Sequence, residues 1–578
     1  MKLYTTESLL STRDMTLEMA CCRLLAHKVV GLASIPSNAE ILVALKSMKP
    51  YKALGLDGLH AGFFQRHWNC VGDSVKDEVR NIFLSCKMLA FLNQTLIALI
   101  PKQKGPETIS HFRPISLCNI VYKLVTKILV QRLRPHMPNL ISPCQTAFVA
   151  GRCGSDNVII AQEIIYSLNK RKGKEGFMVV KIDLEKANDR LEWCFIRKVL
   201  TCFGFPPNII KLIISCISSS STSLLFNGEK LPPFAPSRGI RQGNPLTPFI
   251  FLLCVEYLNA QIEDLYDSKQ WMRVKASSKG PGFSHIFFTD DLLLFARANT
   301  KNCDAITTSL GSFCDMAGLK VNKTKSKIFF SSNVSVQVKL DICQQLGFQA
   351  TNNLGCYLGF PIIHKGRNGN AYNFVIERVQ DKLAVWKARV LSLAGKRVLI
   401  NSASTPIVEY YMQCCALPAK VCKTVDKLHR DFLWGSTEEK RKLHLVNWNI
   451  VTLHRDRGGL GMVEMQPRNE AYLAKLCWRL TNEQEAPWVR MLMRKYCTNL
   501  RITETGRKLP CSRTWAACKK GGPIFKRGLK WIINNGIATN LWYDFWLPFS
   551  PLRTCIQGLL NREEADLLVA NIRDEGRN

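Results

Sequence analysis

Two adjacent carboxylates, Asp290 and Asp291, interrupt the mostly apolar run HIFFTDDLLLFAR at residues 285–297. The apolar residues on either side of the pair predict two short strands joined by a turn. A buried carboxylate loses its hydration, and two neighbouring carboxylates also repel each other. The pair is therefore either a solvated turn, where Asp is common, or part of a cation site whose other ligands lie elsewhere in the chain.

A third carboxylate, Asp183, ends the strand that alternating apolar residues predict within GFMVVKIDLEKAND, residues 176–189. If this strand lies beside the 285–297 hairpin, the three carboxylates converge, and two bound Mg²⁺ ions would offset their repulsion. Two such ions hold the attacking and leaving oxygens of a phosphoryl transfer. Lys102 and Arg113 are the cationic candidates for binding the phosphates.

The charge balance indicates a nucleic-acid partner. Lys and Arg number 79 against 45 Asp and Glu, a formal net charge of +34, and the excess is spread along the chain. An extended polyanion suits such a chain, and a basic protein without that partner is the alternative. With 578 residues and 47% hydrophobic residues, the chain is long enough for about two to four domains.

Cysteine spacing and apolar runs indicate an intracellular chain. The 23 cysteines include no C-x-x-C pair, which argues against zinc ribbons and thioredoxin motifs and favours reduced thiols, Cys511 and Cys518 among them. The first residues, MKLYTTESLL, lack the layout of a signal peptide. The apolar run PFIFLLCVEYL is too short for a membrane span and contains Glu256, so no membrane partner is expected.

Periodicity predicts the organisation around these motifs. We expect helices around the glycine-rich loop KALGLDGLH, a strand at 96–102, a helix within 112–137 and a helix over Phe249–Ile262. After residue 362 the pattern is helical, with a core stripe formed by Val375, Val379, Leu383, Trp386, Val390 and Leu393. Residues 491–530 hold eleven Lys or Arg and one acid, Glu504, which indicates either a solvated face or a site for a nucleic-acid backbone.

Taken together and in order, these segments resemble a known family. KIDLEKANDRLEW, RGIRQGNPLTP, HIFFTDDLLLF, GLKVNKTKSKIFFS and YLGFPI are similar to successive motifs of a reverse transcriptase from a non-LTR (LINE-type) retrotransposon of the plant kind. KALGLDGLHAGFFQRHW and HFRPISLCNIVYKLVTKIL resemble the family's amino-terminal extension and fingers. RVQDKLAVWKARVLSLAGKRVLI resembles its thumb, and LHRDFLWG with GGLG resembles its downstream connection.

The resemblance implies an α+β fold with the right-hand polymerase architecture. Fingers, a ferredoxin-like palm and a helical thumb would be followed by a mainly helical C-terminal extension. The implied boundaries are 1–37 unassigned, 38–93 N-terminal extension, 94–362 fingers and palm, 363–435 thumb, and 436–578 a basic connection region that is truncated. The family's endonuclease is expected to be absent, since residues 1–35 are too few to hold one.

The resemblance also implies roles for particular residues. Asp183, Asp290 and Asp291 would bind two Mg²⁺ ions, with Mn²⁺ as an alternative, and Lys325 would protonate the leaving pyrophosphate. The implied nucleotide-binding residues are Lys102, Arg113, Leu184 (through its carbonyl), Asn188, Gln242 and Gly243. Leu358 and Gly359 would help to hold the primer end. The implied partners are an RNA template, a DNA primer and dNTPs, and the implied location is the nucleus.

Several positions depart from the family's pattern. Asn188 stands where an aromatic ring usually lies under the sugar and excludes a ribose 2′-OH, and Asn244 stands where the family usually has Asp. Leu54 and Leu56 replace two prolines, and Ala150 replaces a third. None of these changes removes a metal ligand. Two hypotheses follow: an RNA-directed DNA polymerase with two-metal nucleotidyl transfer, or a degenerate, non-catalytic relic of the element that at most binds nucleic acid.

Overall fold

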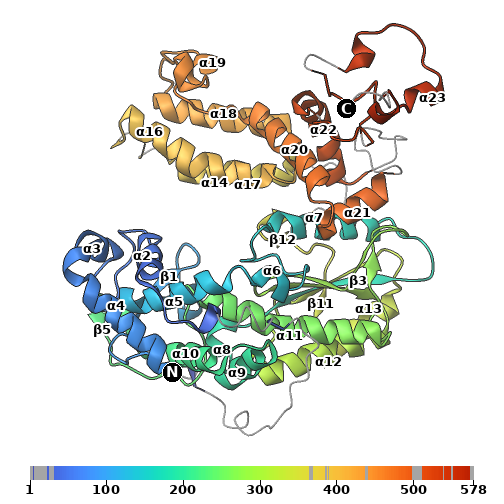
Figure 1. Cartoon of the computed structure of the whole chain (residues 1–578). Coiled ribbons are helices and arrows are strands. Elements are labelled where there is room, and N and C mark those ends of the chain that lie inside the picture. The colour runs from blue at the N-terminus through green and yellow to red at the C-terminus, as the bar shows by residue number, and fades with distance from the viewer. Residues whose placement is uncertain are drawn as a thin grey trace. The chain divides into compact units, whose positions relative to one another are not determined.

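The computed structural model describes residues 4–5, 23–24, 31–362, 369–384, 387, 390–436, 440–497, 511–530, 532–537, 539–547 and 551–572 (Figure 1). The chain divides into two compact units. One comprises Met1–His364 with Ala486–Met491, and the other comprises Lys365–Glu485 with Leu492–Asn578. Both helices and sheets are present, as expected for an α+β chain. No helix in the described part of the chain has the length and apolar character needed to span a bilayer.

A five-stranded sheet carries the first unit's central motifs. Its strand order is β11-β10-β3-β9-β8. The strands are β3 (Phe177–Asp183), β8 (His285–Phe288), β9 (Asp291–Arg297), β10 (Lys327–Phe330) and β11 (Gln349–Ala350). The order β10-β3-β9-β8, with helices between β3 and β8 and between β9 and β10, gives the βαββαβ connectivity of ferredoxin-like sheets. The strands predicted around Asp183 and the Asp290–Asp291 pair are thus confirmed, and they are sheet neighbours.

Helices cover this sheet and form its core. They are α7 (Gly154–Leu168), α8 (Ala187–Arg190), α9 (Trp193–Cys202), α11 (Thr247–Asp267), α12 (Thr300–Ala317) and α13 (Val336–Leu346). The helix predicted over Phe249–Ile262 is confirmed within α11, whose second residue is Pro248, a position where a missing N–H costs no hydrogen bond. Apolar side chains of α9, α11 and α12 pack with those of β3 and β9 in one large core.

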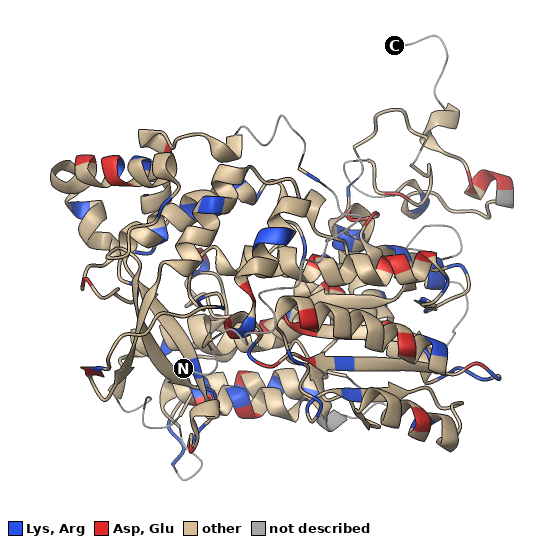
Figure 2. Cartoon of the chain, turned by 90° about the horizontal axis from the view of Figure 1, so that it is seen from below, with Lys and Arg blue, Asp and Glu red and all other residues tan. Residues whose placement is uncertain are grey.

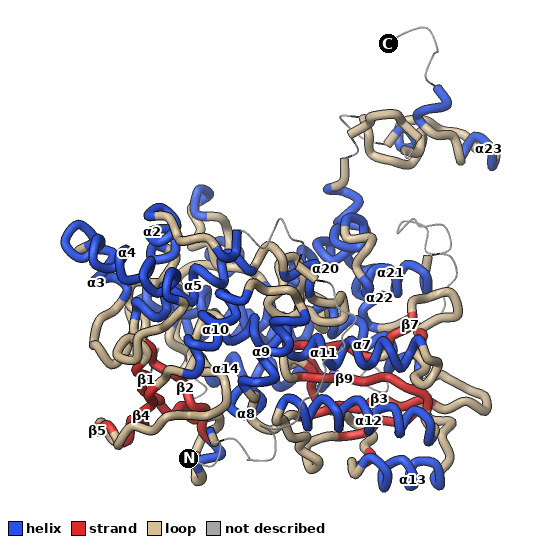
Figure 3. The backbone as a smooth tube through the Cα atoms, turned by 60° about the horizontal axis from the view of Figure 1, so that its bottom comes forward, coloured by secondary structure: helices blue, strands red, loops and turns tan. Residues whose placement is uncertain are grey.

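A second sheet has the order β2-β1-β4-β5 and is a separate group of strands (Figure 3). Its strands are β1 (Gln94–Pro101), β2 (Phe112–Cys118), β4 (Ser221–Phe226) and β5 (Glu229–Lys230), and α5 (Ile120–Leu133), α6 (Met137–Leu140) and α10 (Pro207–Ser218) are the neighbouring helices in sequence. The strand predicted at 96–102 is confirmed as part of β1. The helix predicted within 112–137 begins only at Ile120, because residues 112–118 pair with β1 as strand β2. Two short hairpins, β6 (Val274–Lys275) with β7 (Gly282–Phe283) and β12 (Cys356–Tyr357) with β13 (Phe360–Pro361), complete the strands.

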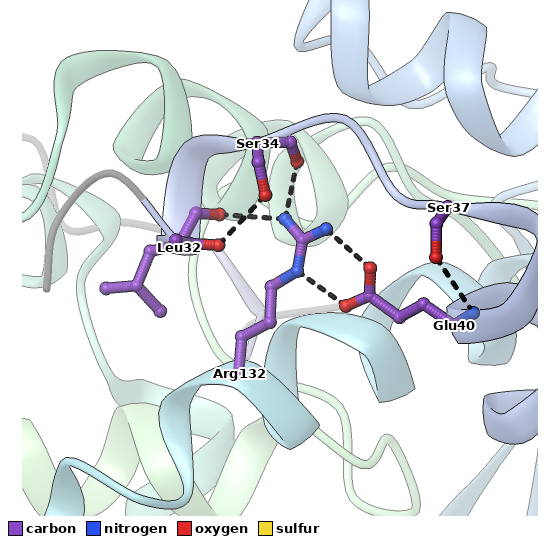
Figure 4. Close-up of polar contacts among 6 residues, drawn as sticks. Leu32, Ser34, Ser37, Glu40 and Arg132 are labelled. Atoms are coloured by element: carbon purple, nitrogen blue, oxygen red, sulfur yellow. Dashed lines mark hydrogen bonds and ion pairs between the residues drawn. The ribbon is translucent and has the colours of Figure 1, made fainter.

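Helices α2 (Asn38–Lys46), α3 (Ala61–Arg66) and α4 (Trp68–Ser85) surround the glycine-rich loop, as expected. Arg132 of α5 ties them down (Figure 4). Its guanidinium donates to both carboxylate oxygens of Glu40, at 2.7 and 2.8 Å, and to the carbonyls of Leu32 and Ser34. Ser37 accepts a hydrogen bond from the Glu40 amide and so caps the start of α2. The Arg132 side chain thus fixes the start of α2.

In its described residues, the second unit is built from helices. They are α14 (Asn373–Lys382), α16 (Leu393–Leu399), a π-helical turn (Ile400–Ser404), α17 (Thr405–Met412), α18 (Ala419–Trp434), α19 (Trp448–Val451), α20 (Met465–Asn482), α22 (Arg513–Gly528) and α23 (Arg562–Ala565). Helix α21 (Pro487–Tyr496) spans the boundary given above. Val375, Val379 and Leu383 of the predicted stripe are buried, Leu393 and Val390 are exposed, and Trp386 lies outside the described residues. The finer domain boundaries stay predictions.

Candidate active site

The three predicted carboxylates lie at one edge of the five-stranded sheet. In the pairing of β3 with β9, Asp183 is the direct partner of Asp291. Thr289 and Asp290 form the two-residue turn between β8 and β9, and Phe288 pairs with Asp291 across this turn. Asp183 is half-buried, while Asp290 and Asp291 reach solvent. The sheet register, which the sequence does not specify, therefore places the three residues next to one another.

The carboxylates influence one another electrostatically. Partial burial raises the pKa of Asp183 above its ordinary value, the charge of Lys325 lowers it, and the charge of Asp290 raises it. The pKa of Asp291 is raised by desolvation and then by the charges of Asp290 and Asp183, which Lys181 partly offsets. A bound dication would relieve this mutual repulsion. The donor set of carboxylates at adjoining strand ends therefore fits a hard divalent cation.

The side chains do not form a closed metal cage by themselves. In the part of the chain that is described, no group of three or more His, Cys, Asp or Glu side chains converges tightly enough to hold an ion. Cations at this edge would therefore need further oxygen ligands, such as phosphate oxygens. The assignment of Asp183, Asp290 and Asp291 as metal ligands stays a prediction.

A loop pinned to the end of β3 brings Lys325 towards Asp183. The Asn322 amide donates to the Asp183 carbonyl at 2.8 Å, and the Glu185 amide donates to the Lys320 carbonyl at 2.8 Å. The Ser326 hydroxyl accepts from the Asp183 amide at 3.2 Å. These bonds hold both flanks of Leu184 without using its carbonyl. The position of Lys325 thus follows from backbone pairing, and its charge acts directly on Asp183.

Lys325 belongs to a group of four cations centred on Lys102. Burial lowers the pKa of Lys102, and the charges of Lys186, Lys325 and Arg113 lower it further. Lys102 follows β1, and its amide and ammonium groups donate to the carbonyls of His111 and Ser110. Arg113 pairs with Ile100 across the same β1–β2 hairpin. The two predicted phosphate ligands therefore lie together with Lys325.

Lys186 is a fourth member of this cation group that the sequence did not indicate. It lies three residues after Asp183, has a left-handed backbone (φ 44°) and precedes helix α8. Its side chain is exposed, and its charge acts on Lys102 and on Asp189. Proximity to Asp183 along the chain was the available signal, but the side-chain direction depends on this unusual backbone turn. We name Lys102, Arg113, Lys186 and Lys325 the cation cluster.

The loop with Gln242 and Gly243 lies against strand β2. The Ser116 amide donates to the Gln242 carbonyl at 2.8 Å. Gly243 has a φ of 107°, and a Cβ there would lie 2.9 Å from the Ser116 carbonyl oxygen, so glycine is required. On the loop's other side, the Ile240 amide donates to the Asn188 carbonyl at 2.7 Å. The structure thus brings Gln242, Gly243 and Asn188 together beside β2, the strand that carries Arg113.

Asn188 and Asn244, two of the departures from the expected pattern, have different surroundings. Asn188 is partly exposed in α8, at the loop just described. Asn244 is buried: its amide donates to the Tyr122 hydroxyl at 2.8 Å, and its side-chain oxygen accepts from the Leu246 amide. The Tyr122 hydroxyl in turn donates to the Cys216 carbonyl. Asn244 is therefore a satisfied structural residue, and its change from Asp leaves no polar group of that side chain unpaired.

Leu358 and Gly359 form the two-residue turn of the β12–β13 hairpin, and both have positive φ, 47° and 78°. This hairpin lies beside the carboxylates. The Lys181 ammonium donates to the Cys356 carbonyl at 2.7 Å, and the Lys181 charge also acts on Asp183 and Asp291. A Cβ on Gly154 would meet both Phe288 and Leu358, which shows how closely the two hairpins approach. The structure thus places the residues predicted to hold the primer close to those predicted to bind metal ions.

The basic stretch from Arg494 to Lys530 is only partly described, since 498–510 lie outside the described residues. Helix α22 packs closely on α20, where a Cβ on Gly521 would lie 2.4 Å from the Leu473 backbone. Lys520, Lys526, Arg527 and Lys530 are exposed. Lys and Arg are also spread over many other elements (Figure 2). A role of this stretch in binding nucleic acid stays a prediction.

Comparison with known proteins gives a consistent result. Residues 100–362 match the family model described as reverse transcriptase (RNA-dependent DNA polymerase). The chain is 25% identical over 442 residues to the transposon TX1 149 kDa protein of Xenopus laevis, covering 73% of this chain and 31% of that protein. It is 25% identical over 395 residues to a Pol polyprotein from the type-1 retrotransposable element R2 of Popillia japonica, covering 64% of this chain and 50% of the relative.

A third relative is the Pol polyprotein from the type-2 retrotransposable element R2DM of Drosophila melanogaster, 25% identical over 248 residues, or 43% of this chain and 22% of that protein. The chain therefore spans between about a fifth and a half of the length of these relatives. Of these three relatives, the two R2 proteins are named Pol polyproteins.

Proposed function

We propose that this chain, whose residues 100–362 form a reverse transcriptase domain of the non-LTR retrotransposon type, is an RNA-directed DNA polymerase that adds dNTPs to a primer 3′-OH. The single observation that carries the proposal is the carboxylate edge: Asp183 and Asp291 are direct partners on neighbouring strands, Asp290 adjoins them, and the charge of Lys325, a member of the cation cluster, acts on Asp183. Negative groups for metal ions and positive groups for phosphates are what nucleotidyl transfer needs side by side.

In this proposal the parts of the chain take the roles of a right-hand polymerase. The five-stranded sheet is the palm, and the four-stranded sheet with α5 belongs to the fingers. The helices from residue 363 to 435 are the thumb, and 436–578 are the connection region. The ferredoxin-like connectivity of the sheet supports the palm assignment, because the carboxylates lie at the ends of its central strands.

The incoming triphosphate would be bound by the cation cluster. Lys102, Arg113 and Lys186 would neutralise its phosphates, and their mutual repulsion without a ligand favours a polyanion between them. Gln242 and Gly243 would contact the nucleotide from the loop beside β2, and Asn188 would lie next to its sugar. Leu358 and Gly359, in the hairpin beside the carboxylates, would position the primer end.

In the reaction the primer 3′-OH gives its proton to water, its oxygen bonds to the α-phosphorus, the bond from that phosphorus to the bridging oxygen breaks, and pyrophosphate leaves. Asp183, Asp290 and Asp291 would hold two Mg²⁺ ions, which supply charge stabilisation for the attacking and leaving oxygens. The Lys325 ammonium would give a proton to the leaving pyrophosphate. The carboxylates themselves would fix the positions of the ions and keep negative charge at this edge of the sheet.

A non-catalytic relic of the element is the second candidate. One observation favours it: Asn188 stands where the family usually has an aromatic ring. Asn244 gives no support to the relic, because its side chain is buried and hydrogen-bonded through both its nitrogen and its oxygen. An active enzyme of this kind would work on nucleic acid in the nucleus, the location we propose for it.

A primer-extension assay on poly(rA)/oligo(dT) with dTTP and Mg²⁺ tests the proposal. We expect extension by the natural chain and none by Asp290→Asn, with template binding within about twofold in both, since phosphate contacts elsewhere supply that binding. Asp304→Asn, at an exposed residue of α12, is the matched control that removes one carboxylate far from the edge. Template binding without any extension by the natural chain would establish the relic instead.

A further inference from the structure

The turn that carries Asp290 is held by a loop outside the predicted motifs. Residues 142–149 run beside β8, where Gln145 forms a parallel bridge with Phe287. The Phe287 amide donates to the Cys144 carbonyl at 2.8 Å, and the Thr146 amide donates to the Phe287 carbonyl at 3.2 Å. The loop therefore acts as one more short strand alongside β8, the outermost strand of the five-stranded sheet, and lies next to the turn.

We propose that Gln145 is a positioning residue that holds the Thr289–Asp290 turn through its side-chain oxygen. Gln145 is 1% exposed. Its Oε1 accepts hydrogen bonds from the Thr289 amide at 3.2 Å and from the Ala147 amide at 3.1 Å, and so joins the loop to the turn. Its Nε2 is buried and has no hydrogen-bond partner among the described residues. The oxygen, and not the amide nitrogen, is thus the functional atom of this side chain.

The turn needs such support because Thr289 has an unfavourable backbone. Its φ is 53°, in the left-handed region that β-branched residues rarely adopt. Its hydroxyl lies 2.7 Å from the Phe288 carbonyl and 3.0 Å from Asp290 Oδ1, so its orientation bears on that carboxylate. A strained turn persists only when its surroundings fix it. The bond from the Thr289 amide to Gln145 is such a constraint.

The loop is itself fixed firmly enough to serve as a support. The Arg152 guanidinium donates to the carbonyls of Pro138, Ile141, Ser142 and Gln145 at 2.5–3.0 Å. Glu256 of α11 accepts from the Ser142 amide and from Asn259, and Asn259 is bonded to His285 of β8. The loop and the strand that leads into the turn are therefore anchored to the same helix.

Loss of the Gln145 oxygen should affect the turn and spare nucleotide binding. The Thr289 amide would lose its acceptor in a partly buried place, and the turn would relax towards less strained backbone angles, moving Asp290. The cation cluster is carried by other elements and would stay in place. The expected signature is a fall in kcat per template-binding chain with an unchanged KM for the nucleotide; because a loss of folded chains also lowers the apparent kcat at unchanged KM, the rate is referred to the fraction of chains that bind template.

Hydrogen–deuterium exchange on the full chain tests the positioning independently of activity. We expect the amides of residues 287–292 to exchange at least tenfold faster in Gln145→Met, which has no acceptor, and at the natural rate in Gln145→Glu, which keeps one. Gln261→Met, a partly buried glutamine of α11 bonded to Tyr257 and Ser312, controls for the loss of an amide as such. Gln145→Asn, whose oxygen is drawn back by one methylene, replaces Gln145→Met if that variant does not fold.

Primer extension adds the kinetic readout, which alone rests on the proposed function. We expect kcat for dTTP to fall at least tenfold in Gln145→Met with KM within twofold, and Gln145→Glu to recover most of the rate. Equal exchange in the natural chain and Gln145→Met, or equal acceleration in Gln145→Met and Gln145→Glu, would overturn the positioning role. A natural chain without extension would refute the proposed function and leave the exchange result to decide on Gln145.

Discussion

Replacing Glu256 by Gln is expected to stabilise the first unit at alkaline pH and to have little effect in acid. Glu256 lies in α11 and is 7% exposed. Burial raises its pKa to about 8, while the Ser142 amide and the charge of Arg152 act in the opposite direction. Its Oε1 accepts from the Ser142 amide at 3.1 Å and from Asn259 at 2.6 Å. Glutamine keeps this acceptor and removes the ionisable group.

The sign follows from proton binding in the two states. Between the ordinary carboxyl pKa and pH 8, the folded chain keeps a proton on Glu256 that the unfolded chain has released, so stability falls as pH rises. Each pH unit over which the states differ by one proton changes the free energy of unfolding by about 1.4 kcal/mol. The loss therefore approaches about 4 to 5 kcal/mol above pH 8, and Glu256→Gln should avoid it.

Thermal and urea unfolding of the natural chain and Glu256→Gln at pH 5, 7 and 9 measure this difference. We expect nearly equal stability at pH 5 and a growing advantage of the variant towards pH 9. Glu229→Gln, at an exposed residue of β5, changes the net charge equally without a buried carboxyl and should show no such trend. A difference between Glu256→Gln and the natural chain that does not change with pH would refute the reasoning, because Glu256 would then be ionised when folded.

Three further predictions concern other parts of the chain. Asn188→Tyr should raise the ratio of kcat/KM for dTTP over UTP by about tenfold or more, because a ring fills the space of a ribose 2′-OH; an unchanged ratio would place the sugar gate elsewhere. Arg132→Met should lower the free energy of unfolding by about 2 to 4 kcal/mol, since it leaves Glu40 and two carbonyls without their donor; an unchanged melting temperature would contradict this anchoring role. Neutralising four exposed cations of the basic stretch should weaken RNA binding and reduce the slope of log K against log salt by about 3, whereas an equal slope would make it a solvated face; the four are Lys520, Lys526, Arg527 and Lys530.

The sequence by itself determined the local elements and the chemistry at their ends. Alternating apolar residues predicted β3, apolar runs on either side of the aspartate pair predicted the β8–β9 hairpin, and the apolar run after a polar loop predicted α11, because each signal depends on neighbours a few residues apart. The order of motifs gave the family, and the match over residues 100–362 bears it out. The helix predicted within 112–137 is confirmed as α5, but no strand was predicted at 112–118, because its strand character comes from pairing with β1, which no local pattern records.

Only the tertiary structure decided how these elements meet. The register that sets Asp183 against Asp291 depends on strands far apart in the chain, and the left-handed turn that brings Lys186 into the cation cluster has no counterpart in residue periodicity. The same holds for Gln145, whose one useful oxygen meets the turn only after residues 142–149 have lined up beside β8. Burial and hydrogen-bond partners are properties of the folded chain, because each depends on atoms that long-range packing brings within a few ångströms.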